Sequence, residues 1–274
     1  MDNRLTLDVF VGAENGFFVT STIVAGERDA VVIDAQFTRS DARRLAERIK
    51  ALGKNLTTVY ITHGHPDHYM GLNVLQEEFP GARLVTAPEV IPAIDEGKAA
   101  KVAQWKPLYA DELPDNPVTP TALEGDVINL EGNELRVIHL GQGDDHSSTA
   151  VSIPALSAVV AGDFVYNGTH VWLAETNTET RKQWIENIGK LAAMNPTTVV
   201  PGHKAPGADD DGGRALKETR SYIEAFDAAA RSAPNAEMLT KGMNEQFGDR
   251  ALPIILEIAA GAAFSGEPLS TESR

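Results

Sequence analysis

Apolar and polar positions divide the amino-terminal part of the chain into strand-like runs followed by a helix-like segment. Residues 5–11, 17–24 and 30–33 are apolar, β-branched runs separated by glycine and charged turns. Such runs predict an opening β-meander. Residues 41–52 place apolar side chains on one helical face, with Ser40 before them as the expected N-cap. The pattern therefore predicts three strands and then a helix.

The alternation of strand and helix continues to residue 203. We expect strands near 57–61, 83–86, 126–130, 134–140, 149–153 and 158–161, a strand that ends at 203, and helices at 70–78, from about 88, and at about 180–193. Residues 101–120 instead carry Trp105 and four prolines, which predicts an irregular segment. Long irregular segments inside compact domains are often lids or substrate walls, so we expect Trp105 either to line a substrate site or to anchor this segment to the core.

After Gly213 the pattern becomes helical. Residues 214–232 are rich in Ala, Glu and Arg, and Pro234 and Pro253 are expected to start two further helices, the last running to about 263. That last helix is apolar almost all round, so we expect burial against the same chain, with a homodimer as the alternative to a monomer. The predicted organisation is a catalytic domain over 1–210 with a helical extension over 211–274 packed on it.

One short segment carries most of the chemical information. It follows the β-branched run 57–62 and contains three imidazoles and one carboxylate, His63, His65, Asp67 and His68. Histidine nitrogen and carboxylate oxygen are good zinc ligands, and a site that leaves one position to water is catalytic. The segment lies where a strand passes into a helix, at the carboxyl end of the strand, where open α/β sheets place their sites. It therefore predicts a catalytic metal site.

This segment resembles the H-x-H-x-D-H signature of the metallo-beta-lactamase superfamily. Two later motifs follow in the order that the family shows: Asp163 after the apolar run 158–160 and a glycine, and His203 after Pro201 and Gly202. The resemblance covers roughly residues 5–205. It implies an α/β protein with a four-layer αββα sandwich, and usually two metal ions, which we expect to be zinc.

The resemblance also implies two ligand sets and a shared carboxylate. One metal takes His63, His65 and a third ligand, the other takes Asp67, His68 and His203, and Asp163 bridges the two.

The third ligand of the first metal departs from the family pattern, because Gln142 falls in the register of the usual histidine and His146 lies four residues later. A glutamine oxygen binds zinc poorly compared with imidazole. We expect His146 to reach the vacant position, because the surrounding loop is rich in Gly and Asp and can bend. Two other outcomes stay open: Gln142 ligates weakly, or only the second metal is tightly held.

Charge and composition narrow the partners. The net charge of -15 repels nucleic acid and anionic membranes, so we expect a small-molecule substrate. The chain has no cysteine, so thiolate ligands are excluded. No signal peptide is visible at the amino terminus, and no apolar run approaches the roughly twenty residues that span a bilayer. We therefore expect a cytoplasmic protein.

The predicted chemistry is hydrolysis, because zinc lowers the pKa of bound water to about 7 and no covalent nucleophile is apparent. We expect an ester-like substrate, a lactone or a thioester, since the family's true β-lactamases lack the bridging Asp that this chain has as Asp163. Asp67 is expected to hold metal and accept a proton from the attacking water. The alternatives are a diiron oxidoreductase and a catalytically impaired metal-dependent binding protein.

Three further residues are candidates for supporting roles. Tyr166 stands where lactonases of the family carry a substrate-binding tyrosine, and its phenol would donate to a developing oxyanion, although a packing role is also open. His170 would flank the same cleft, but a surface position is the simpler expectation. Asp34 ends the strand at 30–33 and either braces the metal loop or is an ordinary strand-end carboxylate.

Overall fold

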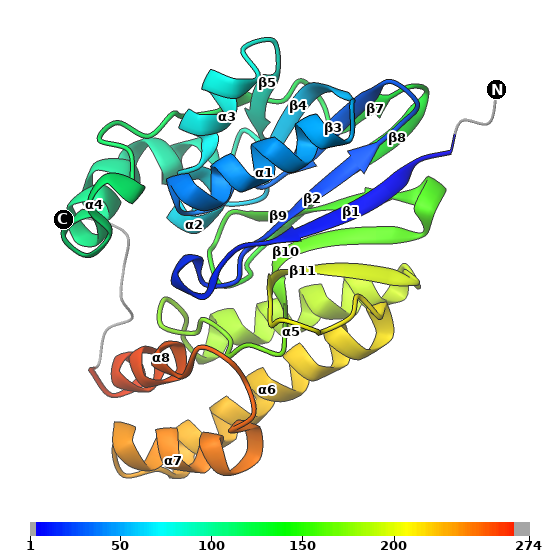
Figure 1. Cartoon of the computed structure of the whole chain (residues 1–274). Helices are drawn as coiled ribbons and strands as arrows, with labels where there is room; N and C mark the ends of the chain where they lie inside the picture. The colour runs from blue at the N-terminus through cyan, green and yellow to red at the C-terminus, as the bar shows by residue number, and fades with distance from the viewer. Residues whose placement is uncertain (1–3, 266–274) are drawn as a thin grey trace.

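The computed structural model describes residues 4–265, which form two stacked β-sheets between two helical layers (Figure 1). The first sheet contains, in spatial order, β1 (Thr6–Val11), β2 (Thr20–Ala25), β3 (Asp29–Ile33), β4 (Asn55–Ile61), β5 (Arg83–Thr86) and β6 (Thr121–Ala122). The second contains β11 (Thr198–Lys204), β10 (Ala158–Asn167), β9 (Ser148–Ile153), β8 (Asn133–Gly141) and β7 (Val127–Leu130). The meander β1–β3 is antiparallel, and β3 to β6 are parallel.

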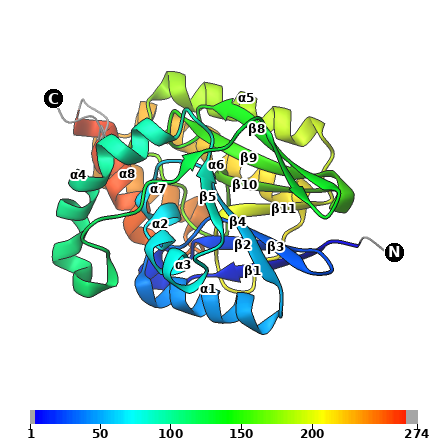
Figure 2. The same ribbon diagram turned by 90° about the horizontal axis from the view of Figure 1, so that it is seen from above.

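Helices cover the outer face of each sheet. Those on the side of the first sheet are α1 (Arg39–Ala51), α2 (Pro66–Tyr69), α3 (Leu72–Glu78) and α4 (Ile91–Tyr109). Those on the side of the second sheet are α5 (Thr178–Ala193) and α6 (Gly212–Ser232), with α7 (Ala236–Phe247) and α8 (Pro253–Ser265) after them. This arrangement confirms the predicted αββα sandwich with carboxy-terminal helices. In the view from above, α4 and α8 lie at the same end of the molecule, as they do in Figure 1 (Figure 2).

The space between the sheets is filled by aliphatic side chains from both of them. Val31 and Ile33 of β3 belong to one buried cluster with Val151 of β9 and Val160 of β10. These strands are buried on both faces, because a helical layer covers the outside of each sheet. β3 and β10 therefore appear in the sequence as nearly continuous apolar runs rather than as alternating ones.

Two sequence-based expectations about the elements are wrong. The segment 101–120 was expected to be irregular, but its first half belongs to α4, which runs to Tyr109 with Pro107 in its last turn. Alanine-rich sequence before Pro107 favours helix, and the proline removes a backbone donor only where the helix is about to end. The N-cap of α1 is Thr38, whose hydroxyl accepts from the backbone N–H of Asp41, rather than Ser40.

The carboxy-terminal helices continue the outer layer over the second sheet. Buried side chains of α5, α6, α7 and α8 share one hydrophobic cluster with β10, which includes Trp184, Phe226 and Leu256. The last helix therefore packs on its own chain, as expected from its composition. Its burial is one-sided, however, because Ile254 remains 49% exposed. The division at residue 210 stays a prediction. Across residues 4–265, no helix combines the length and apolar character that crossing a bilayer requires.

Gly71, between α2 and α3, sits where a side chain has no room. A Cβ at this position would lie 1.9 Å from the backbone oxygen of Ala35, in the loop after β3. We predict that Gly71→Ala lowers the free energy of unfolding by about 1–3 kcal/mol or more, because the clash is with backbone that cannot rotate away.

Gly189 in α5 provides the matched control, since a Cβ there meets no atom within 4 Å. Gly189→Ala should raise the free energy of unfolding by about 0.5–1 kcal/mol through lower backbone entropy of the unfolded chain. Urea denaturation of both variants measures the difference. Equal effects of the two substitutions would contradict the packing around Gly71.

Candidate metal centre

The histidine-rich segment forms the turn between β4 and α2. Parallel strand β4 ends at Ile61, and Pro66 at the first position of α2 has the backbone torsion that a helix start requires. His63 lies in the turn before the helix, and His65 is its N-cap. Asp67 and His68 follow in the first turn of α2, so the four side chains start from one compact piece of backbone at the edge of the sheet.

Two groups of metal-ligand side chains converge at this edge. The donor atoms of each group lie within 4.8 Å of one another: His63, His65, Asp144 and Asp163 in the first, and Asp67, His68 and His203 in the second. Asp163, on β10, lies between them. Its Oδ1 is 3.1 Å from Nε2 of His68, and its Oδ2 is 3.1 Å from Nε2 of His203 and 3.9 Å from Nε2 of His63.

The donor set fits a divalent cation. Among the described residues, Nε2 of His63, Nε2 of His68 and Oδ1 of Asp163 are buried without a hydrogen-bond partner. Buried polar atoms nearly always have a hydrogen-bond partner. Three neighbouring buried atoms without one therefore indicate a site where an ion would be their partner. Imidazole nitrogen and carboxylate oxygen are ligands that zinc accepts.

Hydrogen bonds behind the cluster orient the imidazoles. Asp34 accepts from the backbone N–H of Thr62 at 2.8 Å, and its Oδ2 is 2.9 Å from Nδ1 of His68. Nδ1 of His203 lies 2.7 Å from the backbone oxygen of Phe17. A carboxylate or carbonyl on one ring nitrogen leaves the other ring nitrogen free to bind metal. Of the two interpretations of Asp34, the structure therefore supports the brace.

The expected third ligand of the first group is corrected by the structure. The ring of His146 points away from the group: its side chain is 63% exposed and its Nδ1 lies 2.7 Å from Asp145. The amide of Gln142 donates to the backbone oxygen of Gly143. Asp144 takes the position instead, with Oδ2 at 3.0 Å from Nδ1 of His65. In this loop the side chain at position 144 therefore points toward the ligand group, whereas the side chain two residues later, at position 146, points toward solvent.

The sequence pattern did not single out Asp144, because the family usually has a histidine as the third ligand. A carboxylate in the same loop also suits zinc, and that signal was present in the sequence. Glu175 was overlooked as well: its Oε2 lies 3.3 Å from Nε2 of His65, and its Oε1 lies 3.3 Å from the ammonium of Lys101 on α4. Glu175 thus contacts the ring nitrogen of His65 that points away from the group, as Asp34 does for His68. No sequence motif marks Glu175.

The remaining candidates lie at the same site. The hydroxyl of Tyr166 is 2.6 Å from Oδ2 of Asp163 and 3.0 Å from Oδ2 of Asp144, and its ring stacks on His203 at 5.1 Å. His170 is buried rather than on the surface as expected, with Nδ1 at 2.8 Å from the hydroxyl of Tyr222. Its imidazole is enclosed because α6 packs over it.

Burial and mutual charge shape the protonation of the cluster. Burial lowers the pKa of His63 to about 3. Burial also opposes protonation of His203, but the carboxylates of Asp163 and Asp67 together outweigh it and raise the pKa of His203. Burial raises the pKa of Asp144 above its usual range, against the opposing effect of His65. A divalent cation needs neutral imidazoles and ionised carboxylates, so its binding would displace protons and depend on pH.

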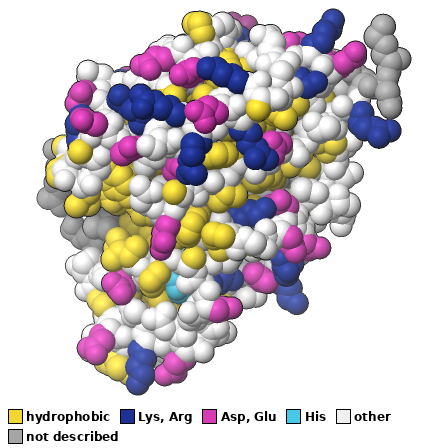
Figure 3. Space-filling view, viewed as in Figure 1, with side chains coloured by type: hydrophobic (Ala, Val, Ile, Leu, Met, Phe, Trp, Pro, Cys, Tyr) yellow, Lys and Arg dark blue, Asp and Glu magenta, His cyan; other side chains and the backbone are white. Residues whose placement is uncertain are grey.

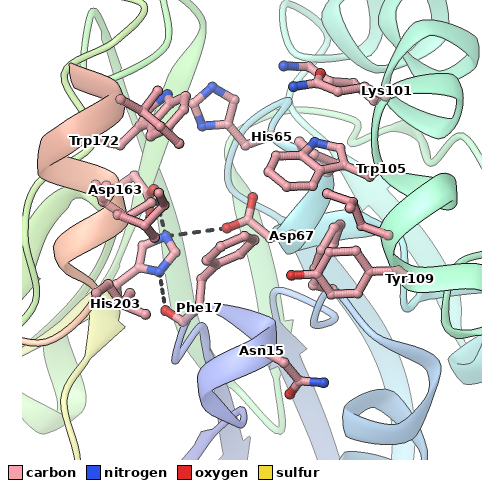
Figure 4. Close-up of a pocket in the computed structure, with 18 of the residues that line it drawn as sticks. Asn15, Phe17, His65, Asp67, Lys101, Trp105, Tyr109, Asp163, Trp172 and His203 are labelled. Carbon is pink, nitrogen blue, oxygen red and sulfur yellow. Dashed lines mark hydrogen bonds and ion pairs between the residues drawn. The ribbon is translucent and has the colours of Figure 1, made fainter. Parts of the chain in front are cut away.

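A cavity of about 770 Å³ opens over the cluster, with His65, Asp67, Asp163 and His203 at its floor (Figure 4). In Figure 4, Trp105 and Tyr109 of α4 stand on one side of the cavity and Trp172 stands on the other. Tyr166 and His170 line it as well. The structure therefore brings Trp105, Tyr166 and His170 to the cavity that also reaches the metal ligands.

Comparison with known proteins assigns the family. The model of the metallo-beta-lactamase superfamily matches residues 15–203. The chain is 26% identical over 178 residues to a hydroxyacylglutathione hydrolase from Aeromonas salmonicida (strain A449). That match covers 65% of this chain and 58% of the relative, so the chain spans less than two thirds of the relative's length.

Two solved structures have the same fold. A metallo-beta-lactamase family protein from Thermus thermophilus superposes with a TM-score of 0.68 at 20% identity, over 94% of this chain and 91% of that one. A beta-lactamase domain protein from Burkholderia ambifaria gives 0.66 at 19% identity, over 94% and 84%. The chain belongs to the metallo-beta-lactamase superfamily.

The geometry predicts which loop residue binds metal. Asp144→Asn should lower the metal content by about one ion per chain, because a neutral amide oxygen binds zinc far more weakly than a carboxylate. His146→Ala, two residues away with its ring pointing outward, should keep the wild-type content. Elemental analysis after dialysis against metal-free buffer measures both. Loss of metal from the His146 variant with retention in the Asp144 variant would restore the sequence-based assignment.

Proposed function

We propose that this protein is a metal-dependent hydrolase that cleaves an ester-like bond, a lactone or a thioester, in a small molecule. The observation that carries the proposal is the pair of ligand groups joined by Asp163 at the floor of an accessible cavity. Membership of the metallo-beta-lactamase superfamily supports it. So does the similarity to a hydroxyacylglutathione hydrolase, whose name denotes cleavage of an acyl-glutathione.

The proposed ligand sets are His63, His65 and Asp144 for one zinc ion and Asp67, His68 and His203 for the other, with Asp163 shared. Bound zinc would supply hydroxide at neutral pH by lowering the pKa of its water to about 7, and would polarise the bond under attack.

The chain's own residues would complete the chemistry. Asp67 lines the cavity beside His203, at 3.4 Å, where its carboxylate would accept the proton released during attack. The hydroxyl of Tyr166 lines the cavity and donates to the buried carboxylates of Asp163 and Asp144. When those carboxylates bind metal instead, its one hydrogen would be available to the oxyanion that develops on the substrate carbonyl. Trp105 would contact the part of the substrate that lies farther from the ligands, and the almost fully buried His170 would border the same part of the cavity.

One observation favours a second candidate. His63, His65, Asp144 and the shared Asp163 form a set of two histidines and two carboxylates, and these ligand types also suit iron. An iron-dependent oxidoreductase would contain iron after purification and consume oxygen with its substrate. Zinc content with hydrolysis and no oxygen uptake would exclude it.

His68→Ala tests the catalytic role of the second ligand set. We predict that the variant loses at least about 100-fold in kcat/KM for thioester or lactone hydrolysis, because the second metal loses a ligand. His139→Ala is the matched control, since His139 lies outside the cluster and pairs with Asp126 at 2.9 Å. Its turnover should equal that of the wild type. Undiminished hydrolysis by the His68 variant would remove the proposed mechanism.

Metal removal gives a test that does not depend on the substrate. Zinc at about 100 times its dissociation constant should stabilise the native state by about 2.7 kcal/mol for each site, because the unfolded chain does not assemble the ligand groups. Chelation should therefore lower the melting temperature, and added zinc should restore it. A melting temperature indifferent to chelator and zinc would argue for a protein without a resident ion.

A further inference from the structure

We propose that the substrate carries a bulky, uncharged, apolar group, and that this group binds between α4 and α8, above the metal ligands. This inference rests on the proposed hydrolase function and specifies its substrate class. It also distinguishes this chain from its acyl-glutathione-hydrolysing relative, because glutathione is a peptide with two carboxylates.

The first wall of the cavity is an aromatic cluster from three separate segments. Phe17 comes from the β1–β2 loop, Phe37 from the β3–α1 loop, and Trp105 and Tyr109 from α4. Ring centroids are 4.8 Å apart for Phe37 and Tyr109, and 5.6 Å apart for Phe17 and Trp105. In Figure 4 the rings of Phe17, Trp105 and Tyr109 stand beside Asp67, so an apolar group against them would be next to the reacting centre.

The opposite wall is the apolar face of α8. Ile254, Ile255 and Ile258 line the cavity together with Leu252, which precedes the helix. Ile254 is 49% exposed, and Leu108 on the α4 side is 76% exposed. Hydrophobic side chains gather on this face between α4 and α8 (Figure 3). Large apolar side chains left open to solvent around one cavity mark a binding site for an apolar partner.

The charges around the cavity do not suit an anionic ligand. Outside the ligand groups, the charged side chains among the described lining residues are Lys101, Glu112 and Glu175. Lys101 is paired with Glu175, and both are largely buried, at 14% and 11% exposed. Glu112 accepts hydrogen bonds from the backbone and hydroxyl of Ser40. A substrate carboxylate would therefore lose its hydration without gaining a cation of its own, which is costly.

A series of acyl thioesters of N-acetylcysteamine tests the apolar preference. From acetyl to octanoyl, kcat/KM of the zinc-loaded protein should rise about threefold to fourfold per methylene until the cavity is filled, as about 0.8 kcal/mol per buried methylene implies. A second series with a constant acetyl group and a lengthening alkyl thiol covers the case in which the apolar group leaves. Replacing the terminal methyl of the hexanoyl substrate by a carboxylate should lower kcat/KM at least about tenfold.

Binding gives a readout independent of turnover. Two of the three tryptophans, Trp105 and Trp172, line the cavity, whereas Trp184 is in the core. An unreactive ten-carbon alkyl amide should therefore change the intrinsic fluorescence of the zinc-loaded protein saturably. Its ω-carboxylated analogue should bind at least about tenfold more weakly. The Trp105→Phe and Trp172→Phe variants identify which ring reports the binding.

A charge placed in the α8 wall should cancel the preference. Ile258→Asp should lower the ratio of octanoyl to acetyl kcat/KM at least about tenfold, because the carboxylate would have to be buried against the alkyl chain. Ile254→Asp, in the exposed first turn of α8, provides a second variant where folding is less at risk. Met238→Asp in the first turn of α7 is the matched control, because Met238 is also exposed and does not line the cavity.

The outcomes separate this inference from the proposed function. Hydrolysis that is indifferent to chain length and to the terminal carboxylate would overturn the apolar preference and leave the hydrolase assignment standing. No hydrolysis of any thioester or lactone, together with tight binding of the neutral amide, would overturn the hydrolase and keep the apolar cavity. Equal binding of the neutral and carboxylated amides would overturn the inference by itself.

Discussion

The buried carboxylate of Asp163 is the group on which the arrangement of the site depends. A carboxylate removed from water costs several kcal/mol unless charges and donors surround it. Here His68 and His203 each approach to 3.1 Å and the Tyr166 hydroxyl to 2.6 Å. Space for it exists because residue 202 on the neighbouring strand is glycine, where a Cβ would lie 1.8 Å from Oδ1 of Asp163. The contacts of Asp163 therefore require β10, β11 and the metal loop to lie close together at this edge of the sheets.

The site divides its tasks between two kinds of scaffold. The ligand atoms lie at the ends of strands and in the turns after them, where the imidazoles are held by hydrogen bonds that they donate to Asp34 and to the backbone oxygen of Phe17. The walls above come from α4 and α8, which present exposed aliphatic and aromatic side chains. A rigid floor keeps reacting atoms aligned, whereas helices on its margin can differ among relatives without disturbing the ligands. Membership of the superfamily therefore says more about the floor than about the walls.

Much of the fold and part of the site could be predicted because their signals are local. The predicted bounds of β4, β5 and β9 lie close to the observed ones, because β-branched and apolar residues gather in short segments. The metal loop is a single short segment, so the proximity of its histidines can be predicted without knowing how the rest of the chain folds. The predictions failed where the signal was not local. Pro107 suggested a loop although the surrounding alanines continue the helix, and His146 suggested a ligand although its backbone turns the ring outward.

By itself, the sequence indicated alternating strands and helices and a metal-binding loop with His63, His65, Asp67 and His68. Its resemblance to the metallo-beta-lactamase superfamily then implied the layered α/β architecture and the further candidate ligands Asp163 and His203, because these motifs occur in the order that the family shows. Only the tertiary structure decided that Asp144 lies in the first group, that Glu175, paired with Lys101, contacts His65 from outside, and that His170 is buried. It also decided that α8 faces α4 across the cavity. Each of these depends on contacts between segments far apart in the chain, and no local pattern specifies the direction of a side chain in a loop or the partner of an apolar helix.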